Sequence, residues 1–263
     1  MPPRTAPPSE RFHRAALALR NLGAVYTSAL SSRSILAPRR RRRLAQEFAW
    51  GMLDALDVEL SVCGPASPAV SPVLLVANHV SWLDVYALNA VAPACFVAKS
   101  DVRDWPVFGT IATRFGTLFI VRGSYRDAAR VRRAAADVLR AGERVVVFPE
   151  GTTTDGTLVE RFYPALFQAA IDARTLVQPV ALRYLDARGR PTRGAIFVGD
   201  MTLVTSIRRV IAEPSLNAEL AFGQPLDAAA HTRKELAHLA REWIAATLGL
   251  RGETMALKPR RAA

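Results

Sequence analysis

The sequence predicts a single α/β domain with a mixed, mostly parallel central sheet flanked by helices, preceded by amphipathic helices at the N-terminus. Two observations support this fold class. Short apolar runs such as 73–77 and 145–148 are typical of buried strands, and they alternate with stretches of helical periodicity. A chain of 263 residues, of which 50% are hydrophobic, is also long enough to bury one sizeable core.

The first 56 residues divide into a tail and two predicted helices. Residues 1–11 are proline-rich and are expected to form a disordered tail. Helical periodicity covers 12–32 and 44–56, and the run Arg39–Arg43 stands between them. Together 12–56 are typical of an anchor at an anionic membrane surface. A helical hairpin packed on the domain, with the arginines in a solvated turn, is the alternative.

Residues 57–250 are predicted to form the domain itself, and 251–263 a second disordered tail. We expect strands at 58–62, 73–77, 96–98, 118–121, 145–148, 175–184, 195–199 and 217–222. We expect helices at 82–90, 105–115, 125–141 and 228–248. Gly142 is suited to end the third of these helices.

The charge of the chain restricts its partners. The formal net charge is +12, and nearly all of the positive charge is arginine. Such a chain suits nucleic acid, anionic lipid headgroups or an acidic carrier. Because the sequence contains no helix-turn-helix, zinc or RNA-binding motif, we do not expect nucleic acid as a partner. Cys63 and Cys95 form no readable disulfide framework, and as reduced core residues they favour a cytoplasmic compartment.

The strongest candidate for chemistry is the pair His79 and Asp84. It follows the apolar run 73–77 directly and opens a predicted helix. Across a strand-to-helix turn, the carboxylate can hold one imidazole nitrogen while the other takes a proton. A lone His-x4-Asp spacing is more often structural, with the aspartate as a local cap. The position after a buried strand, together with a second motif downstream, favours a general base here.

Two further segments carry candidate binding groups. After the strand 145–148 come Pro149, Glu150, Gly151 and Thr152, where backbone N–H groups and hydroxyls can bind phosphate oxygens and Glu150 a substrate hydroxyl. Arg122 ends the strand 118–121, and its planar guanidinium suits a phosphate. An ordinary strand–turn and a surface arginine are the alternatives.

These segments together resemble the phospholipid and glycerol acyltransferases, close to the 1-acyl-sn-glycerol-3-phosphate acyltransferases. Four blocks match in order over residues 57–225: Asn78–Asp84, Gly116–Arg122, Phe148–Thr152 and Val177–Val180. The resemblance implies a glycerolphosphate-acyltransferase-like fold, His79 and Asp84 as catalytic residues, and no metal or cofactor. It also implies that the substrate-binding residues are Gly116, Arg122, Glu150, Gly151, Thr152 and Pro179.

The resemblance also implies a reaction. A fatty-acyl group would pass from acyl-CoA or acyl carrier protein to the sn-2 hydroxyl of 1-acyl-glycerol-3-phosphate, giving phosphatidic acid at the cytoplasmic face of the bacterial inner membrane. One departure concerns the acceptor: the family's third block usually continues with arginine where this chain has Thr153. Lys99 is then a candidate for the missing charge. Relatives that acylate lyso-ornithine lipids share the same four blocks, so another lysolipid is the alternative acceptor.

Overall fold

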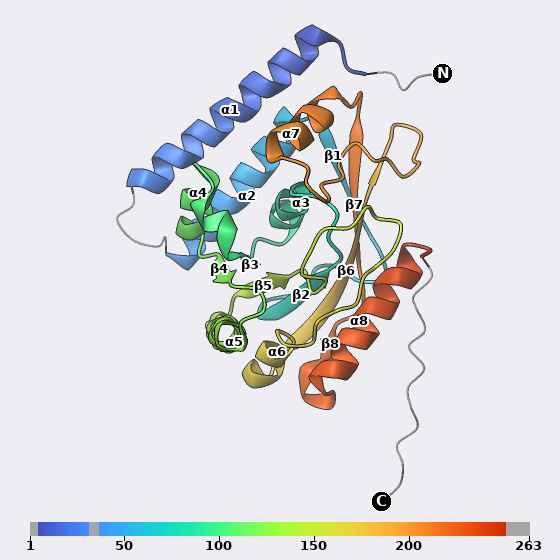
Figure 1. Cartoon of the computed structure of the whole chain (residues 1–263). Helices are drawn as coiled ribbons and strands as arrows, with labels where there is room; N and C mark the ends of the chain where they lie inside the picture. The colour runs from blue at the N-terminus through green and yellow to red at the C-terminus, as the bar shows by residue number, and fades with distance from the viewer. Residues whose placement is uncertain (1–4, 32–36, 251–263) are drawn as a thin grey trace, which may run out of the picture.

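The computed structural model describes residues 5–31 and 37–250 as three layers, with helices on both faces of an eight-stranded sheet (Figure 1). The strand order is β1-β7-β6-β2-β5-β3-β4, and β8 also pairs with β6. The strands are β1 (Val58–Cys63), β2 (Val73–Ala77), β3 (Cys95–Lys99), β4 (Leu118–Ile120), β5 (Arg144–Val147), β6 (Leu176–Leu185), β7 (Leu216–Phe222) and β8 (Leu226–Asp227). The predicted mixed, mostly parallel sheet is confirmed, since the antiparallel pairs among these strands are β6–β7 and β6–β8.

Two separate hydrophobic clusters cover the faces of the sheet. Alternate residues of β2 enter opposite clusters, Val73 and Leu75 the first, Leu74 and Val76 the second, as the period of two in a strand requires. The first cluster is covered by α2 (Pro38–Ala55), α3 (Leu83–Val91), α4 (Phe108–Arg114) and α7 (Leu203–Ala212). The second is covered by α5 (Tyr125–Arg140), α6 (Gln168–Ala173) and α8 (Arg233–Thr247).

One edge of the sheet is formed by the carboxyl ends of four parallel strands. Strands β2, β5, β3 and β4 are neighbours in that order and run parallel. Their carboxyl ends therefore meet at one edge, which is where ligands bind in open parallel sheets. The segments after these four strands begin with Asn78, Phe148, Ser100 and Val121. The predicted site residues His79, Lys99, Arg122 and Glu150 all belong to this edge.

The N-terminal segment forms two helices, α1 (Pro8–Ser31) and α2. The expected tail is too long, because α1 already begins at Pro8, whose fixed φ suits a first helical turn. The arginine run is not a turn between the helices but lies inside α2, where Arg41 forms an ion pair with Glu143. No helix among the described residues is long and apolar enough to cross a membrane. The first four residues of the expected tail and all of 251–263 lie outside the described residues.

Helix α1 packs on the domain by one face. Buried Arg14 bonds Asp57 at 2.7 Å and the backbone oxygen of Glu213 at 2.7 Å, and Ala18 and Leu22 contact the first cluster. An exposed side of α1 next to this face carries the apolar side chains Phe12, Leu19 and Leu30. One side of α1 therefore packs on the domain, as the hairpin alternative expects. Its exposed apolar side chains stay available for contact with a membrane surface.

Two expectations for single elements, and one for a cysteine, are wrong. Residues 195–199 form no strand, because Phe197 uses its backbone N–H on the oxygen of Val80, and Ala195 and Ile196 are buried without strand pairing. The predicted helix 105–115 starts only at Phe108, after a 3₁₀ turn at Ser100–Asp104. Cys95 is buried as expected, whereas Cys63 is exposed. Helices α6 and α7 and strand β8 have no counterpart in the sequence-based expectations.

Candidate active site

The segment Asn78–Asp84, here called the catalytic turn, joins β2 to α3. The amide of Asn78 extends the sheet past the end of β2: its Oδ1 accepts from the N–H of Leu182 at 2.8 Å, and its Nδ2 donates to the oxygen of Leu182 at 2.9 Å. Asn78 is therefore fixed to β6, and the chain is aimed into the turn with His79 as the next residue.

The predicted pair is brought together. Nδ1 of His79 lies 2.7 Å from Oδ2 of Asp84, and the Asp84 side chain is fully buried. The same oxygen accepts the N–H groups of Val80 at 2.8 Å and Ser81 at 3.0 Å. A carboxylate that accepts on Nδ1 selects the tautomer with the proton there, which leaves Nε2 of His79 as a proton acceptor.

The loop after β5 holds His79 from the other side. Glu150 Oε1 accepts the His79 N–H at 2.7 Å, and the N–H of Thr154 donates to the His79 oxygen at 2.8 Å. The ring of Phe148 stacks on the imidazole, with 4.0 Å between centroids and 12° between planes. Both main-chain groups, Nδ1 and one ring face are thus engaged, and the His79 side chain stays 20% exposed. This geometry presents Nε2 to a substrate in a fixed direction.

Glu150 lies in a different place from the one the sequence suggests. Its second oxygen accepts the N–H of Glu160 at 2.8 Å, and the residue is only 3% exposed. Burial raises the pKa of Glu150 to about 7, while the N–H groups of Glu160 and His79 act in the opposite direction. With both oxygens on backbone donors, Glu150 is placed to join two loops, and this geometry favours that role over contact with a substrate hydroxyl.

Lys99 and Arg122 are here called the basic edge: Lys99 is the last residue of β3, and Arg122 follows β4. Lys99 pairs in register with Ile120, so both cations lie at the carboxyl ends of adjacent strands. Lys99 forms an ion pair with Asp101. Arg122 is exposed and bonds no described residue, while the Val121 N–H is fixed by Asp127 at 2.6 Å. Three strand spacings separate His79 from Arg122 across the sheet, about 14 Å of backbone distance.

Gly116 and Pro179 lie apart from the basic edge, and their contact with a substrate stays a prediction. Gly116 precedes β4, at the opposite end of that strand from Arg122, and a Cβ there would meet the Arg41 guanidinium at 2.6 Å. Pro179 is buried inside β6, where its oxygen accepts the Gly223 N–H at 2.9 Å. Its lack of an N–H falls where β6 changes partner from β8 to β7, so no ladder bond is lost there.

Gly151 and Thr152 do lie beside the catalytic turn, in the loop that carries Glu150. Gly151 has φ +69° and its N–H closes a turn on Phe148 at 3.0 Å. This left-handed conformation favours glycine. Thr152 is exposed, and Thr153 is partly exposed next to the Thr154 N–H that binds His79. Both Gly151 and Thr152 therefore remain candidates for contact with a substrate.

Sequence reasoning missed Tyr184, whose hydroxyl donates to Oδ1 of Asp84 at 2.8 Å. The two residues are 100 positions apart, so no local motif joins them. One signal was available: the predicted strand 175–184 is about twice as long as 73–77. If the two strands pair, the end of the longer one must extend past the shorter one. It then lies beside the segment that follows 73–77, which contains His79 and Asp84.

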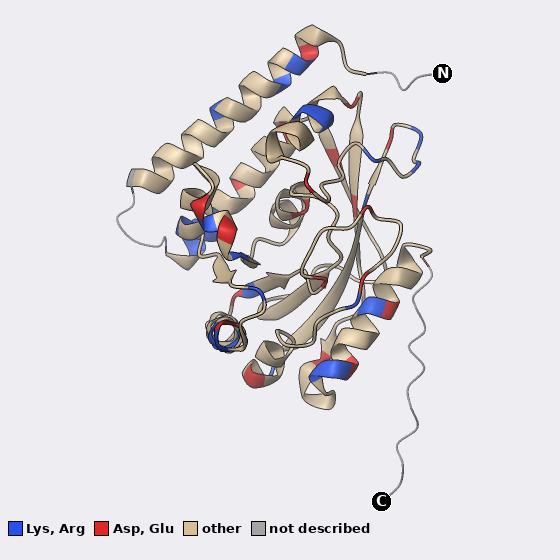
Figure 2. Cartoon of the chain, in the orientation of Figure 1, with Lys and Arg blue, Asp and Glu red and all other residues tan. Residues whose placement is uncertain are grey.

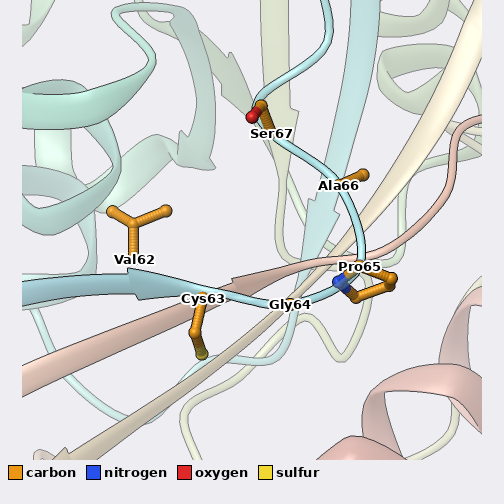
Figure 3. A pocket seen from close by; sticks show the side chains of 6 residues that line it. All are labelled: Val62, Cys63, Gly64, Pro65, Ala66 and Ser67. Carbon is orange, nitrogen blue, oxygen red and sulfur yellow. The ribbon is translucent and has the colours of Figure 1, made fainter.

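Two hollows lie outside the pair itself. An apolar groove of about 470 Å³ is lined by Trp105, Pro106, Phe108, Phe197, Met201, Thr202 and Leu203. It adjoins the catalytic turn, because the Phe197 N–H bonds the Val80 oxygen at 2.9 Å. A second hollow of about 240 Å³, lined by Val62–Ser67, follows β1 (Figure 3). Strands β7 and β6 lie between β1 and β2, so this hollow is three strand spacings away from the catalytic turn.

The fold and the site define the class: an α/β protein in which a buried aspartate orients a histidine at the carboxyl edge of parallel strands, the geometry that a general base needs. The sequence profile of the acyltransferase family matches residues 62–183. A 1-acyl-sn-glycerol-3-phosphate acyltransferase of Neisseria meningitidis is 41% identical over 192 residues, 73% of this chain and 75% of the relative. A lyso-ornithine lipid O-acyltransferase of Pseudomonas aeruginosa is 37% identical, over 85% of this chain and 84% of the relative.

The chain therefore belongs to the acyltransferase family and is an O-acyltransferase. The fold agrees with this. The crystal structure of the 1-acyl-sn-glycerophosphate acyltransferase PlsC from Thermotoga maritima has a TM-score of 0.65 to this chain, at 18% identity, and covers 93% of this chain and 97% of its own.

Proposed function

We propose that the protein transfers a fatty-acyl group from acyl-CoA or acyl carrier protein to the sn-2 hydroxyl of 1-acyl-glycerol-3-phosphate, forming phosphatidic acid. The observation that carries the proposal is the free Nε2 of His79, with Nδ1 held by Asp84 at 2.7 Å, at the sheet edge that also bears Lys99 and Arg122. An imidazole with an open Nε2, at the same sheet edge as two cations, suits an acceptor that carries both a hydroxyl and a phosphate.

The proposed mechanism is direct transfer in a ternary complex. The acceptor oxygen attacks the thioester carbonyl carbon while its proton moves to Nε2 of His79. The carbon–sulfur bond then breaks, and the departing thiolate takes the proton from His79. Asp84 stabilises the imidazolium in between. Arg122 and Lys99 hold the phosphate, Gly151 and Thr152 lie against the glycerol, and Glu150 fixes their loop.

The apolar groove supports the choice of a lipid substrate. Its walls are aromatic and aliphatic, and Phe197 ties it to the catalytic turn. An acyl chain laid in this groove would leave water and place its polar end near His79. Burying methylene groups in this way is favourable by about 0.8 kcal/mol each.

We also propose that the protein lies on the cytoplasmic face of the inner membrane through α1. Phe12 is 78% exposed, Leu19 67% and Leu30 52%, and α1 carries no charged residue after Arg20. In Figure 2 the part of α1 after Arg20 carries neither the blue of Lys and Arg nor the red of Asp and Glu, and the start of α2 is blue. An apolar outer face above a basic protein suits an anionic bilayer.

Flotation of the full-length protein with phosphatidylglycerol vesicles tests the membrane proposal. Wild type should float at low salt, and Phe12→Ser combined with Leu19→Ser should reduce the floating fraction. Leu239→Ser, a substitution at an exposed leucine of α8, is the matched control. A wild type that stays in the unbound fraction at low salt would contradict the proposal.

A lyso-ornithine lipid is the second candidate acceptor. Thr153 stands where the family usually has a cationic residue, and the relative from Pseudomonas aeruginosa aligns over 85% of this chain. The deciding experiment offers the purified protein lysophosphatidic acid and a lyso-ornithine lipid separately, each with acyl-CoA or acyl carrier protein thioester. Mass spectrometry then identifies the product. Acylation of the ornithine lipid alone would replace the first proposal by the second.

A further inference from the structure

Strand β6 reaches beyond the strand it pairs with. Its register with β2 ends at Ala77 and Val180, yet β6 continues to Leu185. Residues 181–185, here called the β6 extension, therefore run alongside the catalytic turn. The bonds between Asn78 and Leu182 fix the extension to the start of the turn at 2.8 and 2.9 Å. The extension also pairs with β7, so it is held on both sides.

Tyr184 connects this extension to the catalytic carboxylate. It is 4% exposed, and its hydroxyl donates to Oδ1 of Asp84 at 2.8 Å. The other oxygen, Oδ2, already serves His79, Val80 and Ser81. Among the described residues, Tyr184 is the donor on which Oδ1 depends. A buried carboxylate oxygen without a donor is costly, so this bond decides how the carboxylate sits.

We propose that Tyr184 is a positioning residue of the catalytic pair: its hydroxyl holds Oδ1 of Asp84 and thereby keeps Oδ2 on Nδ1 of His79. The inference rests on the proposed role of His79 as base. It adds a third member from β6 to a pair that is otherwise local to the turn. Burial, the charge of Asp84 and the bond itself hold the pKa of Tyr184 well above its ordinary value, so the hydroxyl keeps its proton and stays a donor.

The hydrogen bond from Tyr184 also affects how strongly the Asp84 carboxylate attracts a proton on His79. A hydrogen bond to Oδ1 withdraws part of the negative charge of Asp84, which weakens its attraction for an imidazolium. Two further titratable groups face the pair of His79 and Asp84: Glu150 from the loop after β5, and Tyr184 from β6. Of these, Tyr184 is the one whose replacement by phenylalanine removes a single hydroxyl and leaves every formal charge in place.

The test compares Tyr184→Phe with Tyr86→Phe in the full-length protein. Tyr86 is a buried tyrosine of α3, and its hydroxyl bonds no described residue, so its variant controls for the loss of a buried hydroxyl. Acyl transfer from acyl-CoA to lysophosphatidic acid is measured across pH. We expect Tyr184→Phe to lower kcat about tenfold, the size of one hydrogen bond to a charged group. The KM values for both substrates should stay, and the acid limb of the kcat profile should move to higher pH. Tyr86→Phe should match wild type.

A wild-type kcat and acid limb in Tyr184→Phe would overturn the proposal, and so would an equal loss in Tyr86→Phe. A fall in kcat with the acid limb unmoved would overturn it too, because it would show a packing role only. The proton NMR resonance of His79 Nδ1–H provides a readout without turnover, assigned with His79→Ala. If wild type transfers no acyl group, the proposed function fails, yet a resonance that moves in Tyr184→Phe and stays in Tyr86→Phe would still support the link from Tyr184 to His79. A resonance unmoved in both would overturn it.

Discussion

In the catalytic turn, every polar group of His79 except Nε2 already has a partner, whereas Arg122 at the basic edge has none among the described residues. The turn is closed by β6, by α3 and by the loop after β5. The basic edge ends in an exposed turn with Lys99 half-exposed beside it. A reacting group held in one geometry needs no reorganisation during the reaction. The headgroup site proposed at the basic edge consists of exposed cations, so it constrains the shape of a lysolipid less than the turn constrains His79.

Substitution of His79 in the catalytic turn should have the largest effect on activity. His79→Ala removes the base, so kcat should fall by about 10²–10⁴-fold while the KM for the acceptor survives. Asp84→Asn should also be severely impaired, since the amide favours the wrong imidazole tautomer. The double variant should be little worse than His79→Ala, because the two residues share one function. Steady-state kinetics measure this.

His238→Ala, at an exposed histidine of α8, is the matched control and should keep wild-type kinetics. Circular dichroism establishes that the variants are folded, and vesicle flotation shows whether their membrane binding is unchanged. A folded His79→Ala that retains more than about a tenth of kcat contradicts the mechanism, since that loss is far below that of a missing base.

Substitutions at the basic edge should instead weaken binding of the acceptor and leave kcat nearly unchanged. Arg122→Ala should raise the acceptor KM by about 10- to 100-fold, because a charge-assisted hydrogen bond is worth roughly 1.5–3 kcal/mol. The donor KM and kcat should change little. Arg126→Ala removes another exposed arginine four residues along the chain and serves as the control. If the acceptor KM of Arg122→Ala equals that of the control, Arg122 is only a surface residue.

Glu150, which lies between the two regions, should appear in the pH dependence of stability. Its pKa is raised from 4.5 to about 7 in the folded protein, so the folded state binds that proton more tightly than the unfolded chain. The stabilisation is complete below about pH 4.5 and is lost as the pH rises through about 7. Relative to Glu150→Gln, the unfolding free energy of wild type should therefore fall by roughly 1–3 kcal/mol between these limits.

Urea unfolding at pH 5 and pH 8 measures that difference. Glu59→Gln, at an exposed acid of β1, should show no such change relative to wild type. Equal pH slopes in wild type and Glu150→Gln would show that the buried carboxyl titrates as an ordinary glutamate.

The catalytic turn and the rest of the site also differ in how far the sequence predicts them. The pair His79 and Asp84 was readable because a buried strand and a helix start fix both residues within six positions of the chain. The roles of Asn78 and Tyr184 could not be predicted from the sequence, because their partners are distant along the chain. Leu182 lies 104 positions from Asn78, and Asp84 lies 100 positions from Tyr184. Only the register of β6 brings them together.

Other errors have similar physical causes. The apolar residues 195–199 suit a strand or a buried loop equally well, and packing against the catalytic turn decides for the loop. Gly116 belongs to a block with Arg122, but the strand between them sends the two to opposite ends. The arginine run was expected between two helices, because helical periodicity is visible only before and after it, yet it forms the first turns of α2. Glu143 and Glu47, from within the fold, compensate Arg41 and Arg43.

The smallest expected effect concerns Thr153. The residue is partly exposed in the loop that holds His79, and the family usually carries an arginine there. Thr153→Arg adds a guanidinium that attracts a phosphate monoester more than a headgroup of lower charge. Because such a contact is exposed, it is worth roughly 0.2–1 kcal/mol, a factor of about 1.5–5 in kcat/KM for lysophosphatidic acid relative to a lyso-ornithine lipid. Thr247→Arg, at the end of α8, adds the same charge outside the site and is the control. A ratio no different from that of the control would show that the basic edge already supplies the charge, and that Thr153 does not set the choice of acceptor.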